Sequence, residues 1–486
     1  VIIMMFVSSC AVACAYTPLP TPPTTRAPAR RAIIAASVSV AQPLHDWLET
    51  KGVSTSTVQG QQLPGFGLSL VAGKDGVKAG DTLLSVPASM HMTSQSVKAS
   101  PVGQAVEDTI DDDSAMLALG LLQEAALGAD ASACWPYLEI LPSVEDMQIP
   151  LLWSEEERSR LLAGSHLADV VATQLSDLKG QWSALEEGVF PKHPELFPRD
   201  TFRWEGWLWA HAVVLTRALP FGDSLSLIPF LDLANHAAGA KNTCSIAMCK
   251  ADGQVQPVTE EWQLESLGGE AAAVITAGAA LAPGEQVFID YGEAGWRSSW
   301  EMLYTYGFVP GEGQDWLTGG GRPLFFPGLT AEDPLLPQKK ALLVALGADE
   351  AAADGTWVEV KALSRNGGDM APFLRLVHLE EDGSDERAKA LASWSAVPME
   401  MWQALQKPIN DAVEERVATT VLGACDEALD ALPTADDLKD AATPVAIDGS
   451  EETAARIRER LAARVLLGER CALEACTTYW RGVAKE

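Results

Sequence analysis

Several signatures of common protein classes are missing from this 486-residue sequence. It has no G-x-x-x-x-G-K-[ST] loop, no strand-borne G-x-G-x-x-G and no G-x-S-x-G. These absences argue against a P-loop nucleotide site, a Rossmann-type dinucleotide or methyltransferase fold, and a serine hydrolase with a nucleophile elbow. None of the 8 cysteines forms a CxxC pair, so neither a zinc knuckle nor a redox dithiol is indicated. No apolar run is long enough to span a bilayer.

Positive charge is also scarce. The chain has 35 Lys and Arg against 66 Asp and Glu, a formal net charge of −31. So acidic a chain repels phosphate backbones, which argues against a nucleic-acid partner. A hydrophobic content of 47 % is typical of a globular protein, and the length allows two to four domains.

The start of the chain has the composition of a targeting segment. An apolar stretch ends in the small-x-small pattern Ala13-Cys14-Ala15. Arg26, Arg30 and Arg31 follow, and the first acidic residue is Asp46. This order resembles the bipartite signal-plus-transit presequence that leads to a plastid. We therefore expect residues 1–42 to be a targeting presequence and the chloroplast stroma to be the destination. Ordinary secretion and mitochondrial import are the alternatives.

Hydrophobic periodicity divides the rest of the chain into four stretches. Short apolar pieces between Gly and Pro predict small strands and turns over 63–93. Residues 110–215 are mostly helical by pattern, with Ser114 as a predicted cap and Ser154 and Glu157 as an S-x-x-E capping box. Strand character returns over 225–291. After about 330, apolar positions at spacings of three and four predict helices to the end of the chain.

Two segments carry the motifs that stand out. One is IPFLDLANH, residues 228–236, and the other is GEQVFIDYG, residues 284–292, followed by EMLYTYGF at 301–308. Taken singly, Asp232, Asn235 and His236 are typical of turn caps, and the tyrosines of a core. Their combination in this order resembles the SET-domain protein methyltransferases, specifically the plant branch that includes the Rubisco large-subunit lysine methyltransferase.

That resemblance implies an α+β fold. A β-rich SET fold would occupy 43–310, with a helical insertion at about 110–205, and an all-α substrate-binding domain would occupy 325–486. The segments 363–366 and 372–376 resemble that C-terminal domain.

The resemblance also assigns roles to individual residues, with S-adenosylmethionine as the cofactor and no metal. The implied roles are catalysis for Tyr291 and Tyr306, cofactor binding for Gly65, Phe66, Gly67, Arg217, Asn235 and His236, and substrate binding for Asp232 and Phe308. A carboxylate is a plausible bidentate partner for Arg217.

These residue types suit methyl transfer to an amine. The nucleophile must be a neutral amine, whereas free lysine has a pKa near 10.4. A narrow apolar channel and the nearby sulfonium both disfavour the ammonium form. The protein therefore needs orientation and exclusion of water more than a strong base, and tyrosine hydroxyls can orient the amine.

The sequence thus predicts a protein-lysine N-methyltransferase whose partner is a protein substrate, such as the Rubisco large subunit or another stromal protein, and neither nucleic acid nor a membrane. Two alternatives stay open at this point. One is a SET-derived binding module that has lost activity, and the other is a histidine-directed methyltransferase of the same branch.

Overall fold

The computed structural model describes residues 41–237, 244–250, 271–291, 297–310, 319–348, 350–361, 370–380, 385–443 and 453–483. The predicted presequence lies outside them apart from its last two residues, as does the segment 363–366. None of the helices in these ranges is both long enough and apolar enough to cross a membrane.

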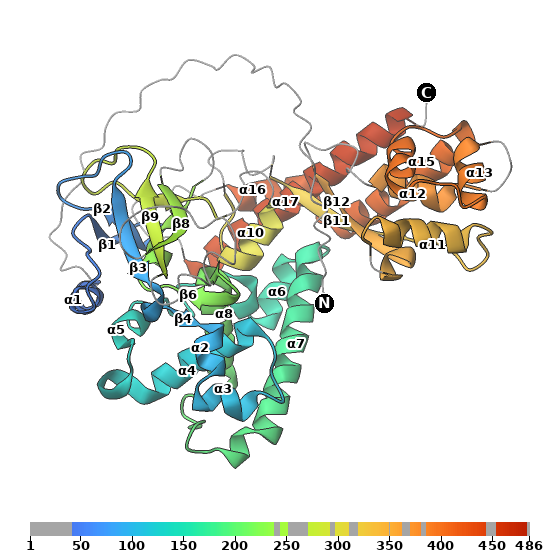
Figure 1. Cartoon of the computed structure of the whole chain (residues 1–486). Helices are drawn as coiled ribbons and strands as arrows, with labels where there is room; N and C mark the ends of the chain where they lie inside the picture. Colours follow the sequence, from blue (N-terminus) through green and yellow to red (C-terminus); the bar gives the residue numbers. More distant parts are fainter. Residues whose placement is uncertain are drawn as a thin grey trace.

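Within the described residues the strands form five small sheets, and Figure 1 shows how they are arranged. In the N-terminal part, β1 pairs with β2, β9 lies between β3 and β8, β6 lies between β4 and β5, and β7 runs parallel to β10. The strands are β1 (Val58–Leu63), β2 (Gly67–Ala72), β3 (Thr82–Pro87), β4 (Met92–Thr93), β5 (Leu219–Phe221), β6 (Ser224–Leu227), β7 (Asn235–His236), β8 (Cys244–Lys250), β9 (Ala271–Ala277) and β10 (Phe288–Ile289). Strand β9 is almost wholly buried because it is the middle strand of its sheet and consists of small apolar residues.

Helices fill the interval between β4 and β5, as predicted. The helices of the N-terminal part are α1 (Gln42–Thr50), α2 (Ser94–Lys98), α3 (Pro101–Val106), α4 (Asp113–Ala131), α5 (Trp135–Leu138), α6 (Glu155–Leu161), α7 (His166–Gly188), α8 (Trp204–Arg217) and α10 (Ser299–Tyr306). The predicted capping box is confirmed: Ser154 accepts from the Glu157 amide at 3.1 Å, and Glu157 accepts from the Ser154 amide at 3.0 Å. The predicted cap Ser114 is wrong, because α4 begins earlier and the Asp112 carboxylate caps it.

The described residues of the C-terminal part are helical apart from one pair of antiparallel strands, which are separated in the chain by a helix. Its elements are β11 (Gly321–Pro327), α11 (Leu336–Ala345), β12 (Gly355–Lys361), α12 (Met370–His378), α13 (Glu386–Ala392), α14 (Pro398–Leu405), α15 (Asp411–Ala431), α16 (Ala435–Ala442) and α17 (Ala454–Val483). Strand β12 lies where the sequence predicted helix, and β11 pairs with it over its whole length. Its sequence, GTWVEVK, is rich in the β-branched and aromatic residues that favour strands.

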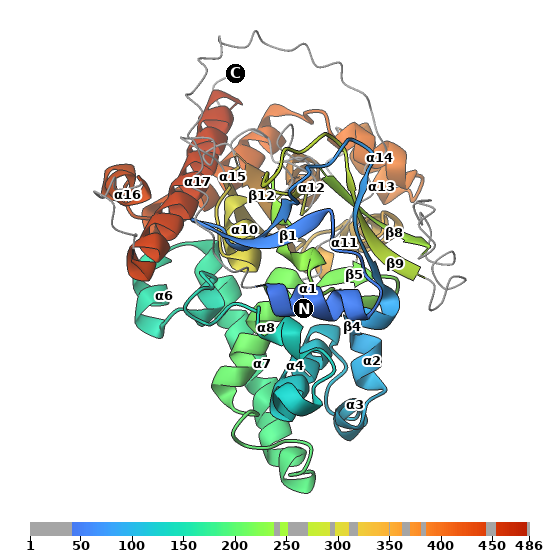
Figure 2. The same ribbon diagram turned by 90° about the vertical axis from the view of Figure 1, so that its left-hand side faces the viewer.

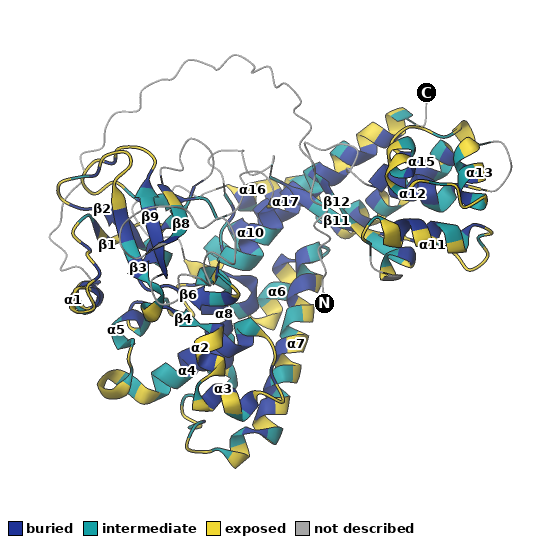
Figure 3. Cartoon of the chain, viewed as in Figure 1, coloured by how far each residue is buried: buried dark blue, intermediate teal, exposed yellow. Residues whose placement is uncertain are grey.

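Two large hydrophobic clusters, and a small one of Cys249, Ala272 and Val274, form the core of the described residues. The first packs α1, the strands β1 to β10 and most of the inserted helices, and it places the apolar faces of α4 and α8 against each other (Figure 3). The second combines the C-terminal helices with Trp153 and Leu162 of the insertion and with Trp300 of α10. Helix α17 runs from the middle of the molecule along the C-terminal helices, and Figure 2 shows α6 beneath its lower end.

A buried ionic group joins the two parts. The Glu469 carboxylate of α17, 1 % exposed, accepts from the Arg322 guanidinium of β11 at 2.6 Å and from the Ser165 hydroxyl at 2.5 Å. Ser165 caps α7. The last helix is therefore tied directly to the insertion. The boundaries predicted for the domains stay a prediction.

Candidate active site

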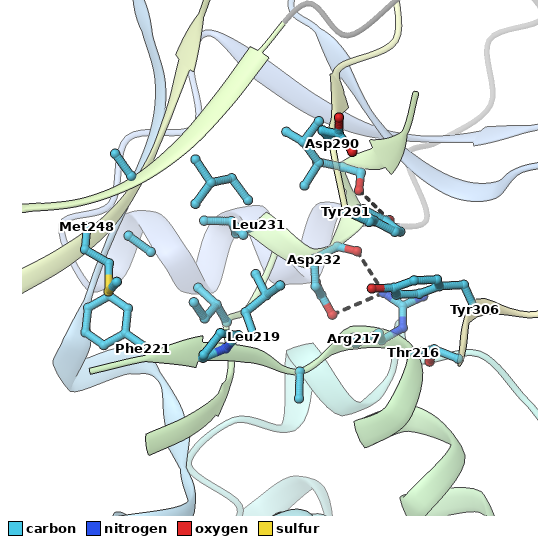
Figure 4. A pocket seen from close by; sticks show the side chains of 18 residues that line it. Thr216, Arg217, Leu219, Phe221, Leu231, Asp232, Met248, Asp290, Tyr291 and Tyr306 are labelled. Atoms are coloured by element: carbon cyan, nitrogen blue, oxygen red, sulfur yellow. Dashed lines mark hydrogen bonds and ion pairs between the residues drawn. The ribbon is translucent and has the colours of Figure 1, made fainter. Parts of the chain in front are cut away.

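A cavity of about 380 Å³ lies where α8 runs into β5 and where β10 meets α10 (Figure 4). Arg217, Asp232, Tyr291 and Tyr306 all line it. They gather at one end, and the apolar side chains of Leu219, Phe221 and Met248 extend towards the other. Four residues that the sequence singled out, which span 90 positions of the chain, thus meet in one cavity.

A buried ion pair forms part of the polar end. The Arg217 guanidinium donates to the Asp232 carboxylate at 3.1 Å and to the Asp232 backbone carbonyl at 3.3 Å. The hydroxyl of Tyr137 in α5 donates to the same carboxylate oxygen at 2.8 Å. Burial raises the pKa of Asp232, whereas the contacts with Arg217 and Tyr137 oppose that shift. The structure therefore gives Arg217 a protein carboxylate as its partner.

Four rings form the adjoining wall. The ring centroids of Tyr291 and Tyr306 are 4.7 Å apart, and the His236 ring lies 5.3 Å from Tyr291. Phe308 lies 6.0 Å from His236 and 6.2 Å from Tyr306. The Tyr291 hydroxyl donates to the backbone carbonyl of Ala234 at 2.8 Å, which fixes the phenol beside the short helix η4 (Leu231–Leu233). Both predicted catalytic residues are thus held in one aromatic group.

The two tyrosines are proton donors and not bases. Burial raises the pKa of Tyr291 and of Tyr306 above the ordinary phenol value near 10. Their hydroxyls therefore stay protonated at neutral pH. Such groups orient a nucleophile through hydrogen bonds and do not remove its proton.

His236 is a hydrogen-bond acceptor through Nδ1. The backbone N–H of Tyr291 donates to this atom at 3.1 Å. Burial lowers the pKa of His236, so the neutral ring is favoured at neutral pH, and the ring proton then resides on Nε2. Because His236 fixes the backbone of Tyr291, this histidine helps to position the phenol.

The predicted cofactor residues in the first loop lie at the turn of the β1–β2 hairpin. Gly65 and Gly67 have positive φ angles of 77° and 71°, and open space surrounds the position of a Cβ at each. Phe66 between them is 53 % exposed, and its ring meets Phe288 of β10 edge-on at 6.2 Å. This turn is therefore a glycine-flanked, open aromatic site.

Asn235 connects that hairpin to the cavity. Its side-chain amide donates to the Ser69 hydroxyl of β2 at 2.8 Å, and its strand partner in β7–β10 is Phe288. The ten predicted site residues therefore occupy two adjoining places. The Gly65–Gly67 turn lies on one side of β7–β10, and the cavity with Arg217 and Asp232 lies on the other.

Two residues of this arrangement were not predicted. Tyr137 sits 95 positions from the carboxylate that it contacts, and Ser69 sits 166 positions from Asn235. The sequence offered one signal for Tyr137, which lies in the apolar segment WPYLEILPS at 135–143. A tyrosine buried in such a segment needs a hydrogen-bond partner for its hydroxyl. The partner itself has no local signature. Within the described residues, no group of three or more His, Cys, Asp or Glu side chains is placed to hold a metal ion.

The chain is also similar to known proteins. Residues 330–473 match the family described as Rubisco LSMT substrate-binding. The chain is 27 % identical over 401 residues to the chloroplastic ribulose-1,5-bisphosphate carboxylase/oxygenase large subunit N-methyltransferase of Nicotiana tabacum, covering 80 % of this chain and 72 % of that protein. It is 32 % identical over 255 residues to an actin-histidine N-methyltransferase of Danio rerio, covering 50 % of this chain and 37 % of that protein.

The fold is also found among solved structures. A crystal structure of the SET domain of LSMT bound to lysine and AdoHcy superposes with a TM-score of 0.73 at 22 % identity, covering 91 % of each chain. The fold is thus that of a SET-domain protein with a helical C-terminal region, as predicted. Within that class, the predicted resemblance to the branch of the Rubisco large-subunit methyltransferase is confirmed.

Proposed function

We propose that this chain transfers a methyl group from S-adenosylmethionine to the side-chain amine of a lysine in a protein substrate. The observation that carries the proposal is the meeting of Tyr291, Tyr306 and the Arg217–Asp232 pair at one end of a single cavity. The curated relatives support the same class of enzyme, a cofactor-dependent protein methyltransferase.

The residues of the hairpin turn fit the cofactor. An exposed aromatic ring at Phe66 offers a face for adenine, and the open glycine backbone on either side allows close approach of a ligand. Asn235 and His236 lie between this turn and the cavity and would hold the polar groups of the cofactor. When bound, S-adenosylmethionine supplies the methyl group as an electrophile on its sulfonium.

The cavity favours a neutral amine. Desolvation between Tyr306, Ile289 and Leu231 disfavours the ammonium form of an incoming lysine. The charges of Arg217 and Asp232 balance each other, and Asp290 is the remaining charged residue in the lining. The Tyr291 hydroxyl and the carbonyls of Ala234 and Asp232 would orient the amine and could accept weak C–H···O contacts from the methyl group.

The names of the same relatives support a proposal for the substrate and for its location. The tobacco relative carries the Rubisco large subunit in its name and is chloroplastic. We propose a stromal protein as substrate, either the Rubisco large subunit or another protein, with the chloroplast stroma as the location. The acid-poor segment before Asp46 supports import into a plastid.

Histidine is a second candidate target. The observation that favours it is the 32 % identity to an actin-histidine N-methyltransferase, which is higher than the 27 % identity to the tobacco protein, although it covers only half of this chain. The two phenols that line the cavity, with the Tyr291 hydroxyl hydrogen-bonded to Ala234, argue against the third prediction, an inactive binding module, because a module without activity has no need of them.

One experiment separates the three. The purified chain is incubated with methyl-labelled S-adenosylmethionine and a plastid extract, the labelled protein is hydrolysed, and the labelled amino acid is identified. We expect methyl-lysine. Labelled methyl-histidine would replace the lysine assignment. No label, together with no binding of S-adenosylmethionine by calorimetry, would favour the inactive module.

A further inference from the structure

The cavity is larger than one target side chain needs. A cavity of about 150 Å³ is enough to enclose benzene, and a lysine side chain has no more heavy atoms than benzene. The cavity here measures about 380 Å³. The target lysine therefore leaves more than half of the space for a second group.

The two ends of the cavity differ in chemistry. Its three charged lining residues, Arg217, Asp232 and Asp290, lie at the end with the tyrosines (Figure 4). The other end is apolar, and Phe221 and Met248 line it. Nothing in the methyl-transfer step uses this second end.

The apolar end is formed by side chains of two strands that are held in place by packing behind them. Leu219 and Phe221 share one face of β5, Ile246 and Met248 share one face of β8, and the intervening Pro220 and Ala247 also line the cavity. The His91 ring packs edge-on against Phe221 at 4.6 Å and contacts the Val86 carbonyl at 3.0 Å through Nε2. Burial lowers the pKa of His91 to about 4, so the ring behind Phe221 is neutral at the pH of a cell compartment.

The spacing matches an extended peptide. Leu219 and Phe221 are two residues apart, and a strand advances about 6.6 Å over two residues. Successive side chains of an extended peptide point to opposite faces, so the residues that share a face with the target lysine are those two positions away. A peptide lying along β5 with its lysine at Tyr291 would direct such a neighbour towards Phe221 and Met248.

We infer that the apolar end of the cavity binds an apolar side chain of the protein substrate two residues from the target lysine. The inference rests on the proposed function and adds a sequence preference to it. Burying a leucine-sized side chain is worth enough to change kcat/KM by tenfold or more. An acidic residue at the same position would lose its hydration without a partner and would be disfavoured.

The test uses the whole chain, labelled S-adenosylmethionine and synthetic peptides with a central lysine. All other positions are glycine or serine, except that one position from −2 to +2 carries leucine or aspartate. We expect leucine at −2 or at +2 to raise kcat/KM at least tenfold over glycine, and aspartate there to lower it. Leucine at −1 or +1 should have a much smaller effect.

A variant locates the preference in the structure. Met248→Glu should bring the leucine-to-glycine ratio of kcat/KM close to one, and Met248→Leu should keep it. Met399→Glu is the matched control, because Met399 is 59 % exposed in α14, outside the cavity, and the ratio should not change there. The wild-type ranking of peptides tests the inference even where Met248→Glu does not fold.

The outcomes separate the two proposals. Equal rates for the leucine and glycine peptides, or a preference for aspartate, would overturn the inference and leave the proposed function in place. A preference that survives Met248→Glu would also overturn it. Transfer to none of the peptides and to no protein of a plastid extract would overturn the proposed function itself.

Discussion

The two sides of the β7–β10 pair differ in how firmly their side chains are held in the absence of a ligand. On the cavity side, Tyr137, Arg217 and Asp232 hold one another in a buried network, with the Asp232 side chain 1 % exposed. On the hairpin side, Phe66 projects into solvent from a turn of two glycines. On the cavity side, an ion pair and a hydrogen bond hold the side chains in place. On the hairpin side, the aromatic ring is exposed and has no polar partner among the described residues to hold it.

This difference indicates where binding energy is available. A preorganised polar group costs no ordering when the substrate arrives, so it serves orientation at the reacting atoms. An exposed aromatic ring gains burial only when a ligand covers it, so it serves affinity. Variants on the cavity side should therefore change stability and turnover, and variants on the hairpin side should change the dissociation constant of the cofactor.

The largest effect is expected from Arg217→Leu. This change leaves the Asp232 carboxylate buried without its ionic partner, which typically costs about 3–5 kcal/mol in the free energy of unfolding. Chemical denaturation measures it. The matched control is Arg481→Leu, which breaks the exposed pair with Asp426 and should cost less than about 1 kcal/mol. Equal losses of unfolding free energy in the two variants would contradict the view that the Arg217–Asp232 pair holds the cavity side in place.

Tyr137→Phe should come next. It removes a hydrogen bond to a charged acceptor, worth about 1.5–3 kcal/mol. Because Tyr137 positions Asp232 without reaching the ligand, we expect a lower kcat with an unchanged dissociation constant for S-adenosylmethionine. Kinetics and calorimetry on the same preparation separate the two quantities. A weakened cofactor affinity with unchanged kcat would contradict the role.

Tyr291→Phe probes the phenol that lies between the two sides. It removes the hydroxyl bound to Ala234 while keeping the ring. We expect turnover to fall at least tenfold and cofactor binding to stay within about twofold. Tyr304→Phe is the control on the same helix as Tyr306, since Tyr304 packs in the second hydrophobic cluster and does not line the cavity. Unchanged turnover in Tyr291→Phe would remove this residue from the mechanism.

Phe66→Ala tests the open side. Stacking of a base on an aromatic side chain is worth about 1–3 kcal/mol, so we expect about a tenfold rise in the dissociation constant of S-adenosylmethionine. The free energy of unfolding should hardly change, because the ring is largely exposed. Phe325→Ala provides an equally exposed control far along the chain. A large loss of stability in Phe66→Ala, with cofactor affinity retained, would contradict the view that the hairpin side serves affinity and not stability.

The smallest effect is expected from lowering the pH, which protonates His236. Burial lowers the pKa of His236 in the folded chain, so its contribution to stability is complete above the unfolded value of about 6.5 and is lost as the pH falls below it. Protonation also turns Nδ1 from acceptor to donor and breaks the contact with the Tyr291 amide. Turnover follows the folded-state pKa of His236, which burial places below 6.5, so the part of the acid decline that depends on His236 should set in below that pH in measurements from pH 8 to 5.5. His236→Asn should remove that part of the decline.

The sequence predicted those parts of the molecule that depend on local order. The S-x-x-E box at Ser154 predicted a helix start. The resemblance to the SET-domain methyltransferases, and not any local pattern, implied that Asn235, His236, Tyr291 and Tyr306 converge. The parts it did not predict depend on pairing over distance. Strand β12 depends on β11, the Asp112 cap competes with a nearby serine, and Tyr137 finds its carboxylate only after the insertion has packed.

The buried group of Ser165, Arg322 and Glu469 has a consequence for chimeric enzymes. Grafting the C-terminal helices of this chain onto a relative would transfer the Glu469 carboxylate. Its two hydrogen-bond partners, Ser165 and Arg322, lie far apart in the sequence. The recipient would have to carry a hydroxyl at the start of α7 as well as the arginine of β11. Recombination points chosen from the sequence alone would separate these three partners, so swaps of substrate preference between relatives should include the start of α7.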